Sequence, residues 1–304
     1  MSASSQLADL LSQIGHRSAK ALSREELLAL PKLYRLAVAE LAEARARGTP
    51  AAQRGTLEYL VIRAHAMLYA PAPLRIGSAI VDLVRAFPAA VRRYRRLVAI
   101  AALLLLVGSL WGYLEVARNP ASAAVLLPGG LQENAEESFQ SGASTREGHP
   151  AYGVFYFTNN ARVAFNAYAL GATFGVGTVL LLLFNGVILG GTIAVVGLVG
   201  SPRVLLSFVL PHGGIELAAI VIAAAGGLAI ADGLLRPGWR RRMDSLRVAA
   251  RESLPLVLGS AALLAVAGLV EGWISPQPLP LAVKAAIGGV LDVLLVVYLF
   301  HSRQ

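Results

Sequence analysis

The sequence predicts an all-α integral membrane protein, a bundle of about six membrane segments preceded by a small N-terminal helical domain. Hydrophobic residues make up 56% of the 304 residues, and the mean hydropathy of +0.62 is too high for an ordinary soluble domain. Charged residues make up 15% of the chain, and the polar region lies mainly before residue 97. Arginine clusters border apolar segments, as they do in multi-pass membrane proteins.

The net charge of +9 does not indicate a nucleic-acid-binding protein, because the basic residues are clustered beside apolar segments. Such clusters orient a membrane protein and meet anionic lipid headgroups. We therefore expect membrane lipids, and no nucleic acid, as partners. The absence of cysteine excludes disulfides, thiolate metal sites and a cysteine nucleophile. The two clusters are Arg92, Arg93, Arg95, Arg96 and Arg236, Arg240, Arg241, Arg242.

The N-terminal region predicts a cytosolic helical domain over residues 1–73. Ser23 and Glu26 have the spacing of a capping box, and leucines then recur at helical spacing up to Gly48. Pro50 opens a second helix, which two further prolines end. The first residues resemble no cleavable signal peptide, so the first membrane segment is expected to direct insertion.

Residues 74–96 predict an amphipathic helix lying in the membrane interface. Apolar residues from Ile76 to Phe87 form one stripe, while the charged residues lie elsewhere on the helix. Pro88 is expected to bend it. The alternative is a fully soluble amphipathic helix, which is less favoured because a membrane segment follows directly.

Six apolar segments follow within a transmembrane domain over residues 97–304. The third is short, about 21 Å of helix against a core of about 30 Å. It either crosses the membrane with help from its neighbours or forms a half-helix around Asn185 and Gly186. Both the second and the third segment could therefore be half-helices that enter the membrane and return. The segments are 97–116, 163–184, 187–200, 213–235, 254–274 and 281–300.

The arginine flanks predict the orientation of these segments. They place the start of the first segment and the loop 236–251 in the cytoplasm. An even number of crossings then puts both chain termini in the cytoplasm. The polar, partly acidic stretch 117–158 is predicted to be an extracytoplasmic loop.

His212 and Glu216 are the most unusual pair in the apolar half. They lie four residues apart and so share one helix face. A charge in hydrocarbon costs about 2.5–3.5 kcal/mol, so such groups usually face a bundle interior or a wet cavity. A zinc site needs a further ligand, which only His149 could supply, so no metal and no cofactor is predicted. In the structural alternative, Arg162 or the helix N-terminus holds Glu216.

Amide side chains extend this polar pattern. The asparagines at the entry of the second segment can cap a helix or bridge neighbouring helices. With the histidine and glutamate they form the predicted cluster, functional or structural, of Asn159, Asn160, Arg162, Asn166, Asn185, His212 and Glu216. Further ionisable residues in apolar sequence are Asp232, Glu271, Lys284 and Asp292.

Glycines in apolar sequence predict close helix packing, because small residues let helix backbones approach in lipid. Gly175 and Gly177 do not form a nucleotide-binding loop, since no strand precedes them. The predicted packing glycines are Gly171, Gly175, Gly186, Gly190, Gly226 and Gly227.

Several of these motifs together resemble the stage II sporulation protein M family. They include N159-N160-A-R162, N185-G186, P211-H212-G213-G214-I-E216, the Gly226–Gly227 pair and E271-G-W-I-S-P276. The resemblance covers about residues 75–300. It implies an integral protein of the bacterial cytoplasmic membrane without demonstrated catalytic activity. The long N-terminal domain fits the relatives of non-sporulating bacteria.

What the resemblance implies about function is a non-enzymatic membrane scaffold linked to cell-envelope or cell-wall processes. Protein partners are expected on both sides of the membrane; family members are often encoded near MoxR-type ATPases and von Willebrand A-domain proteins. Association of the protein with copies of itself, as a homo-oligomer, is a further possibility. The alternative is a small-solute or ion transporter or channel that uses Asn160, Arg162, Asn185, His212 and Glu216.

Overall fold

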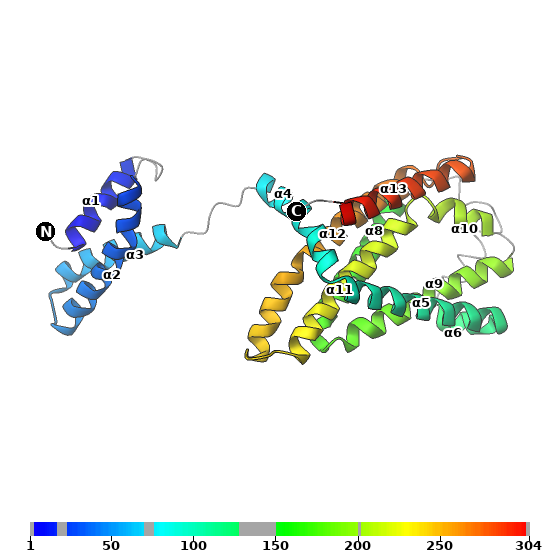
Figure 1. Cartoon of the computed structure of the whole chain (residues 1–304), viewed down its shortest axis with the longest axis horizontal. Helices are drawn as coiled ribbons and strands as arrows, with labels where there is room; N and C mark the ends of the chain where they lie inside the picture. Colours follow the sequence, from blue (N-terminus) through cyan, green and yellow to red (C-terminus); the bar gives the residue numbers. More distant parts are fainter. Residues whose placement is uncertain (1–2, 17–22, 70–75, 128–149, 200–201, 302–304) are drawn as a thin grey trace. The chain divides into compact units, whose positions relative to one another are not determined.

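The computed structural model describes residues 3–16, 23–69, 76–127, 150–199 and 202–301, and this part of the chain forms helices and turns without a strand. The predicted all-α class is therefore confirmed. The chain divides into two compact units, Met1–Arg75 and Ile76–Gln304 (Figure 1).

The first unit consists of α1 (Ala3–His16), α2 (Arg24–Ala46) and α3 (Ala51–Leu68). Ser23 caps α2: its hydroxyl accepts the Glu26 N–H at 3.2 Å, and its own N–H donates to the Glu26 carboxylate at 2.7 Å. Hydrogen bonds from the Ser23 backbone and side chain lower the pKa of that carboxyl. The core of the unit is formed by Leu7, Leu11, Leu30, Leu33, Ala37 and Ala64.

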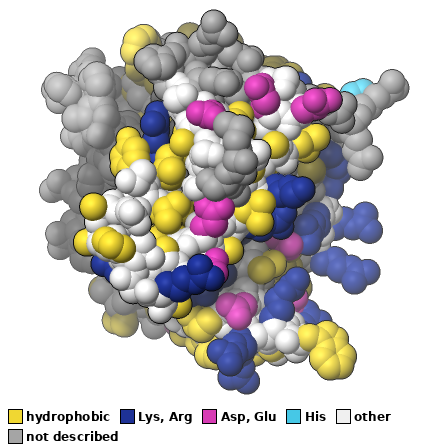
Figure 2. Space-filling model, turned by 90° about the vertical axis from the view of Figure 1, so that its left-hand side faces the viewer, with side chains coloured by type: hydrophobic (Ala, Val, Ile, Leu, Met, Phe, Trp, Pro, Cys, Tyr) yellow, Lys and Arg dark blue, Asp and Glu magenta, His cyan; other side chains and the backbone are white. Residues whose placement is uncertain are grey.

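The surface of this unit carries both signs of charge. Arg45 and Arg54 lie near Glu58, and Arg47 pairs with Glu43 on the last turn of α2. The space-filling view shows acidic and basic side chains interspersed with hydrophobic ones on the face drawn (Figure 2). Such exposed pairs add little to stability.

The second unit begins with α4 (Ile76–Arg93), which is amphipathic as predicted and runs through Pro88 without ending. Phe87 is buried against the bundle, where it fills the space left by Gly259, while Ile80 and Val84 are exposed. The apolar stripe is thus divided: one end packs on the protein and the other faces outward. This suits a helix at a membrane interface.

In the rest of the second unit, the described residues form six long helices. Five of them are long and apolar enough to cross a membrane: α5 (Arg95–Arg118), α9 (Val176–Val199), α11 (Gly213–Leu235), α12 (Arg242–Trp273) and α13 (Leu281–His301). The sixth is α8 (Pro150–Ala169). Shorter elements are η2 (Pro120–Ser122), α6 (Ala123–Leu126), η4 (Leu170–Thr173) and α10 (Pro202–Val209).

Side-by-side contacts fix the direction of each long helix. Gly108 of α5 lies against Leu183 of α9, and Gly112 lies against Val187, so these two helices are parallel. Thr178 of α9 donates to the Ala167 carbonyl of α8 just across the turn at η4, which makes α8 and α9 antiparallel.

The remaining helices continue this alternation. Asn160 and Ala167 of α8 contact Glu216 and Gly227 of α11 in the same order, so these two helices are parallel. In contrast, α12 is antiparallel to α11, because Ser245 bonds Gly233 while Ser275 contacts His212 at the other end. The helix α13 is parallel to α11, because Gly288 and Asp292 lie against Leu210 and Gly214 in the same order. Within the described residues, the six long helices therefore alternate in direction, as a six-traverse topology requires. Because α11 supplies residues to three of the buried clusters, it is the central helix.

The predicted boundaries of the second and third segments are wrong. The chain turns at η4, where Phe174 and Gly175 adopt positive φ angles of 55° and 83°. In consequence α8 ends at Ala169 and α9 is one continuous helix of 24 residues through Asn185 and Gly186. The half-helix alternative fails at this point because the Asn185 amide donates to the Leu181 carbonyl of the preceding turn and leaves the helix intact.

The predicted loop 117–158 is also shorter than expected at both ends. The chain forms η2 and α6 directly after α5, and α8 already begins at Pro150. Leu127 packs with Val116 and Ala194, so the start of this stretch belongs to the bundle. Residues 128–149 lie outside the described part.

A cysteine-labelling experiment tests the predicted orientation. Asn119 and Trp239 are exposed at opposite ends of the bundle, and the chain has no native cysteine. In intact cells we expect an impermeant thiol reagent to label Asn119→Cys and to label Trp239→Cys only after permeabilisation, because the arginine flanks stay in the cytoplasm. The cysteine-free parent is the control. Labelling of both from the same side contradicts the six-traverse topology.

Candidate functional site

A buried polar cluster lies at the end of the bundle opposite the arginine-rich end. Its members come from α8, α11, α13 and the C-terminal end of α12. Burial is deep: His212 and Glu271 are each 3% exposed, and Lys284 is 1% exposed. The polar cluster consists of Asn160, His212, Glu216, Glu271, Ser275 and Lys284.

His212 and Glu216 form the centre of the polar cluster at the start of α11. The Nδ1 atom of His212 lies 3.0 Å from the Ser275 hydroxyl, and its Nε2 atom lies 3.8 Å from a Glu216 carboxylate oxygen. The other Glu216 oxygen accepts a hydrogen bond from the Asn160 amide of α8. The positive end of the α11 dipole also favours a carboxylate in this first turn.

Lys284 connects α13 to the same place. Its ammonium group donates to the Ser275 carbonyl at 2.6 Å and to the Ser207 hydroxyl of α10 at 3.1 Å. One turn further along α13, Gly288 lies against the Leu210 carbonyl, with no room for a Cβ atom. This close approach of α13 to the link between α10 and α11 lies one turn from the contact of Lys284 with Ser207.

Glu271 lies one helical turn deeper than Ser275 on α12. Since α11 and α12 are antiparallel and Ser275 contacts His212, the residues one turn deeper, Glu271 and Glu216, lie opposite each other. Within the described part of the chain, the Oε2 atom of Glu271 is buried without a hydrogen-bond partner. Two carboxyl groups therefore share one buried region, and one of them has a free oxygen.

The structure brings together three of the seven predicted polar residues, namely Asn160, His212 and Glu216. The others lie elsewhere: Asn185 belongs to α9 and bonds its own helix. The other three predicted residues lie on α8 and are exposed, outside the cluster: Asn159, Arg162 and Asn166.

The hypothesised Arg162–Glu216 ion pair does not form. Arg162 is exposed and pairs with no carboxylate among the residues that the structure describes. Residues two apart on a helix do not face the same neighbour, so only one of Asn160 and Arg162 can face Glu216 on α11. The amide takes that position.

Three members of the polar cluster were not among the predicted site residues. Glu271 and Lys284 stood out only as ionisable groups in apolar sequence, and Ser275 belongs to the E271-G-W-I-S-P276 motif. That motif was the available signal, because Glu271 and Ser275 have the same four-residue spacing as His212 and Glu216. Asp292 does not pair with Lys284; its carboxylate lies against Gly214.

The predicted packing glycines all lie at close contacts, some with backbone and some with side chains. Gly171 meets the Gly227 carbonyl, and Gly226 faces the Tyr168 ring. On α9, Gly186 and Gly190 contact the α5 backbone at Leu105 and Ser109, while Gly175 at the turn contacts Ala231. Sequence reasoning missed the matching pair on α5, Gly108 and Gly112, which has the same four-residue spacing.

Fold and site together define a multi-pass membrane protein with a buried polar cluster in its helical bundle. The model of the family described as stage II sporulation protein M matches residues 59–276, more than two thirds of the chain, and the chain belongs to this family. The match begins within α3 and ends before α13, whereas the motifs had placed the resemblance on about residues 75–300.

An uncharacterized protein of Methanocaldococcus jannaschii is also similar. It is 31% identical over 122 residues, which cover 40% of this chain and 68% of the relative. No solved structure matches.

Proposed function

We propose that this protein is a non-enzymatic scaffold of the bacterial cytoplasmic membrane, with both chain termini in the cytoplasm and a role in cell-envelope or cell-wall processes. Membership of the stage II sporulation protein M family supports the proposal. So does the division of the chain into a polytopic bundle and a separate helical unit, since a unit of this kind suits the capture of a soluble partner at the membrane.

The observation that carries the proposal is an exposed apolar face on α3. Tyr59 and Ile62 are 60% and 68% exposed, and Tyr69 at the end of the helix is 65% exposed. Ile62 and Tyr69 lie seven residues apart and so share a face, with Tyr59 beside them. His65 stacks on Tyr69 with ring centroids 4.6 Å apart and bonds the Tyr34 hydroxyl at 3.0 Å. Exposed apolar side chains gathered on one face are typical of protein-binding surfaces.

The expected partner of this face is a cytosolic protein. By family resemblance, MoxR-type ATPases and von Willebrand A-domain proteins are the candidates. The stretch between α6 and α8 is proposed to meet a second partner outside the cytoplasm. In this arrangement the polar cluster holds α8, α11, α12 and α13 together, because its hydrogen bonds join all four.

A crosslinking pull-down from native membranes tests the scaffold role. We expect Ile62→Glu to abolish capture of the cytosolic partner, because it places a charge in an apolar contact. Gln53→Glu is the matched control: Gln53 is exposed on the opposite face of α3, nine residues away. Equal capture by both variants, or equal loss, would contradict the assignment of this face.

The second candidate is a transporter of protons or small cations, and Glu271 is the observation that favours it. Its unpartnered carboxylate oxygen faces the region of Glu216 inside the bundle. Ionisable groups within membrane segments commonly mark ion or proton pathways.

Glu271→Gln separates the two candidates. It replaces a buried carboxyl by a neutral group of the same shape, so we expect the melting temperature to stay the same or rise. A scaffold would then keep its partner capture and its cellular function. A transporter would lose function, and liposomes carrying the variant would lose the proton or cation flux measured with a pH-sensitive or ion-sensitive dye. Leu198→Gln, at an exposed position of α9, is the control for adding an amide.

A further inference from the structure

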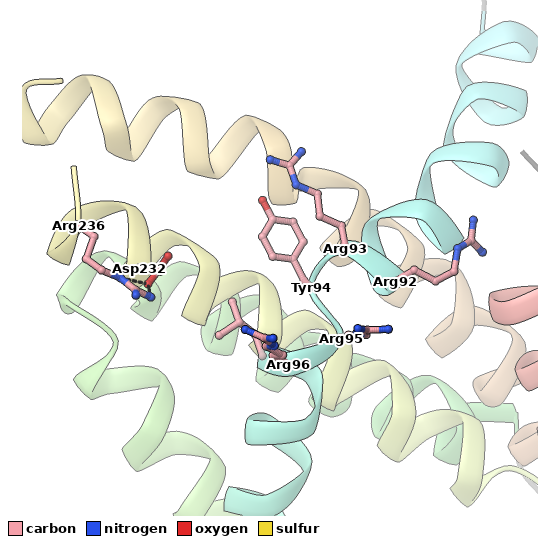
Figure 3. Close-up of a pocket in the computed structure, with 8 residues that line it drawn as sticks. Arg92, Arg93, Tyr94, Arg95, Arg96, Asp232 and Arg236 are labelled. Atoms are coloured by element: carbon pink, nitrogen blue, oxygen red, sulfur yellow. Dashed lines mark hydrogen bonds and ion pairs between the residues drawn. The ribbon is translucent and has the colours of Figure 1, made fainter. Parts of the chain in front are cut away.

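An arginine pocket lies at the other end of the second unit, where α4 meets α5. The hollow has a volume of about 490 Å³. In Figure 3 the arginines of the α4–α5 junction lie above the first turn of α5, and the Asp232–Arg236 pair of α11 lies beside them. The arginine pocket is lined by Arg92, Arg93, Tyr94, Arg95, Arg96, Leu97, Asp232 and Arg236.

Internal contacts neutralise or occupy three of its five arginines. Arg236 pairs with Asp232 on the last turn of α11. Arg93 donates to Glu252 of α12 at 2.7 Å and lies over the Tyr94 ring. Arg92 donates to the Leu299 carbonyl of α13 at 2.5 Å.

Arg95 and Arg96 are left without a counter-charge. Both are exposed, and in the described part of the chain neither forms an ion pair with a carboxylate. They open α5, whose first turn is bonded from the N–H groups of Leu97 and Val98 to the Tyr94 carbonyl. The N–H groups at the start of a helix carry its positive end and favour an anion; of these, the Tyr94 N–H already donates to the Ala90 carbonyl of α4. Two free guanidinium groups and the positive end of a helix dipole thus act at one place.

The apolar surface below this place is suited to an acyl chain. Ile100, Leu103 and Val107 lie four, seven and eleven residues after Arg96, so they continue its face of α5. They are 46%, 60% and 50% exposed. On the other side of the junction, α4 presents exposed Ile80 and Val84. A cationic pocket therefore lies next to an exposed apolar stripe on the same helix.

We propose that the arginine pocket binds the anionic headgroup of a phospholipid, with the phosphate between Arg95, Arg96 and the start of α5. One acyl chain lies along the stripe from Ile100 to Val107. A membrane lipid fits better than a soluble phosphate because charge and apolar stripe occur on the same helix face. Guanidinium groups suit the oxygens of phosphate because they donate two parallel hydrogen bonds.

The test uses the full-length chain purified in detergent and titrated with dioctanoyl phosphatidylglycerol, dioctanoyl phosphatidylcholine and inorganic phosphate. Binding is read from the shift in melting temperature and from native mass spectrometry. We expect the intact chain to prefer phosphatidylglycerol over phosphatidylcholine and to respond to neither phosphate nor salt at matched ionic strength. Equal binding of the two lipids overturns the proposal, and saturation by inorganic phosphate at the lipid's concentration assigns the pocket to a soluble anion instead.

Paired variants locate the site. Arg95→Gln with Arg96→Gln is expected to weaken phosphatidylglycerol binding about 30-fold, from the attraction of two basic residues to an anionic headgroup. The control pair Arg118→Gln with Arg203→Gln removes the same charge from two exposed arginines away from the pocket and should leave binding unchanged. An equal loss of phosphatidylglycerol binding in both double variants would mean that the lipid is attracted by the overall positive charge, and would refute the site. If the first pair does not fold, Arg96→Gln alone should weaken binding about fivefold.

Discussion

Gly190→Ala is expected to lower the free energy of unfolding by about 1–3 kcal/mol, the range for overpacking a tight interface. Gly190 of α9 lies directly against the Ser109 carbonyl of α5, and Gly186 lies one turn away against the Leu105 carbonyl. A methyl group at Gly190 would meet backbone rather than a flexible side chain. The two helices would have to separate along a contact that their glycines make possible.

Gly197→Ala is the matched control for this prediction. Gly197 lies on the same helix, is exposed, and has no atom within 4 Å of the position a Cβ would take. Alanine is the better helix former, so this substitution should be neutral or stabilise by about 0.4–1 kcal/mol. Both variants are compared by thermal unfolding in the same detergent. Similar melting temperatures for the two would show that the α5–α9 contact tolerates a larger separation.

Asn160→Ala is expected to destabilise the bundle by about 1–3 kcal/mol, because it leaves the Glu216 carboxylate, whose side chain is only 15% exposed, without its amide donor. Asn160 is the contact from α8 to this carboxylate, and the nearby His212 already contacts Ser275. Glu216→Gln in the Asn160→Ala background should recover part of the loss, because a neutral amide costs less to bury than a carboxylate.

Asn159→Ala is the control for this double-mutant cycle. Asn159 precedes Asn160 on α8 but is exposed, so its loss should change stability by less than about 0.5 kcal/mol. The cycle is measured by thermal unfolding of all four proteins. Additive effects of the Asn160 and Glu216 substitutions would mean that the two side chains do not interact, since contacting pairs give coupling energies of about 0.5–3 kcal/mol.

Where one helix ends and the next begins was predictable only in part. The fourth segment agreed with α11 because His212 and Gly213 follow a proline and open a strongly apolar run. The second and third segments were misplaced because Asn185–Gly186 looked like a break, while the turn at Gly171–Gly175 lay in sequence that looked uniformly apolar. A side chain such as Asn185 that bonds its own helix leaves no signal of this in the sequence.

The candidate site could likewise be predicted only in part from the sequence. His212 and Glu216 could be predicted as partners because four-residue spacing puts them on one helix face. That Asn160 rather than Arg162 faces Glu216 depends on the rotation of α8 about its axis, which the packing of Ala167 and Gly171 on Gly227 sets. The sequence of α8 alone does not predict that rotation.

The sequence by itself determined that this chain is an apolar, helical, multi-pass membrane protein with ionisable groups inside its bundle, because composition and helical periodicity are local properties. Only the tertiary structure decided which of those groups meet. Glu271, Ser275 and Lys284 join His212 and Glu216 because the C-terminal end of α12 and the start of α13 both lie at the N-terminal end of α11. Contacts between residues far apart in the chain depend on helix direction, rotation and depth, and these are set by packing across the whole bundle.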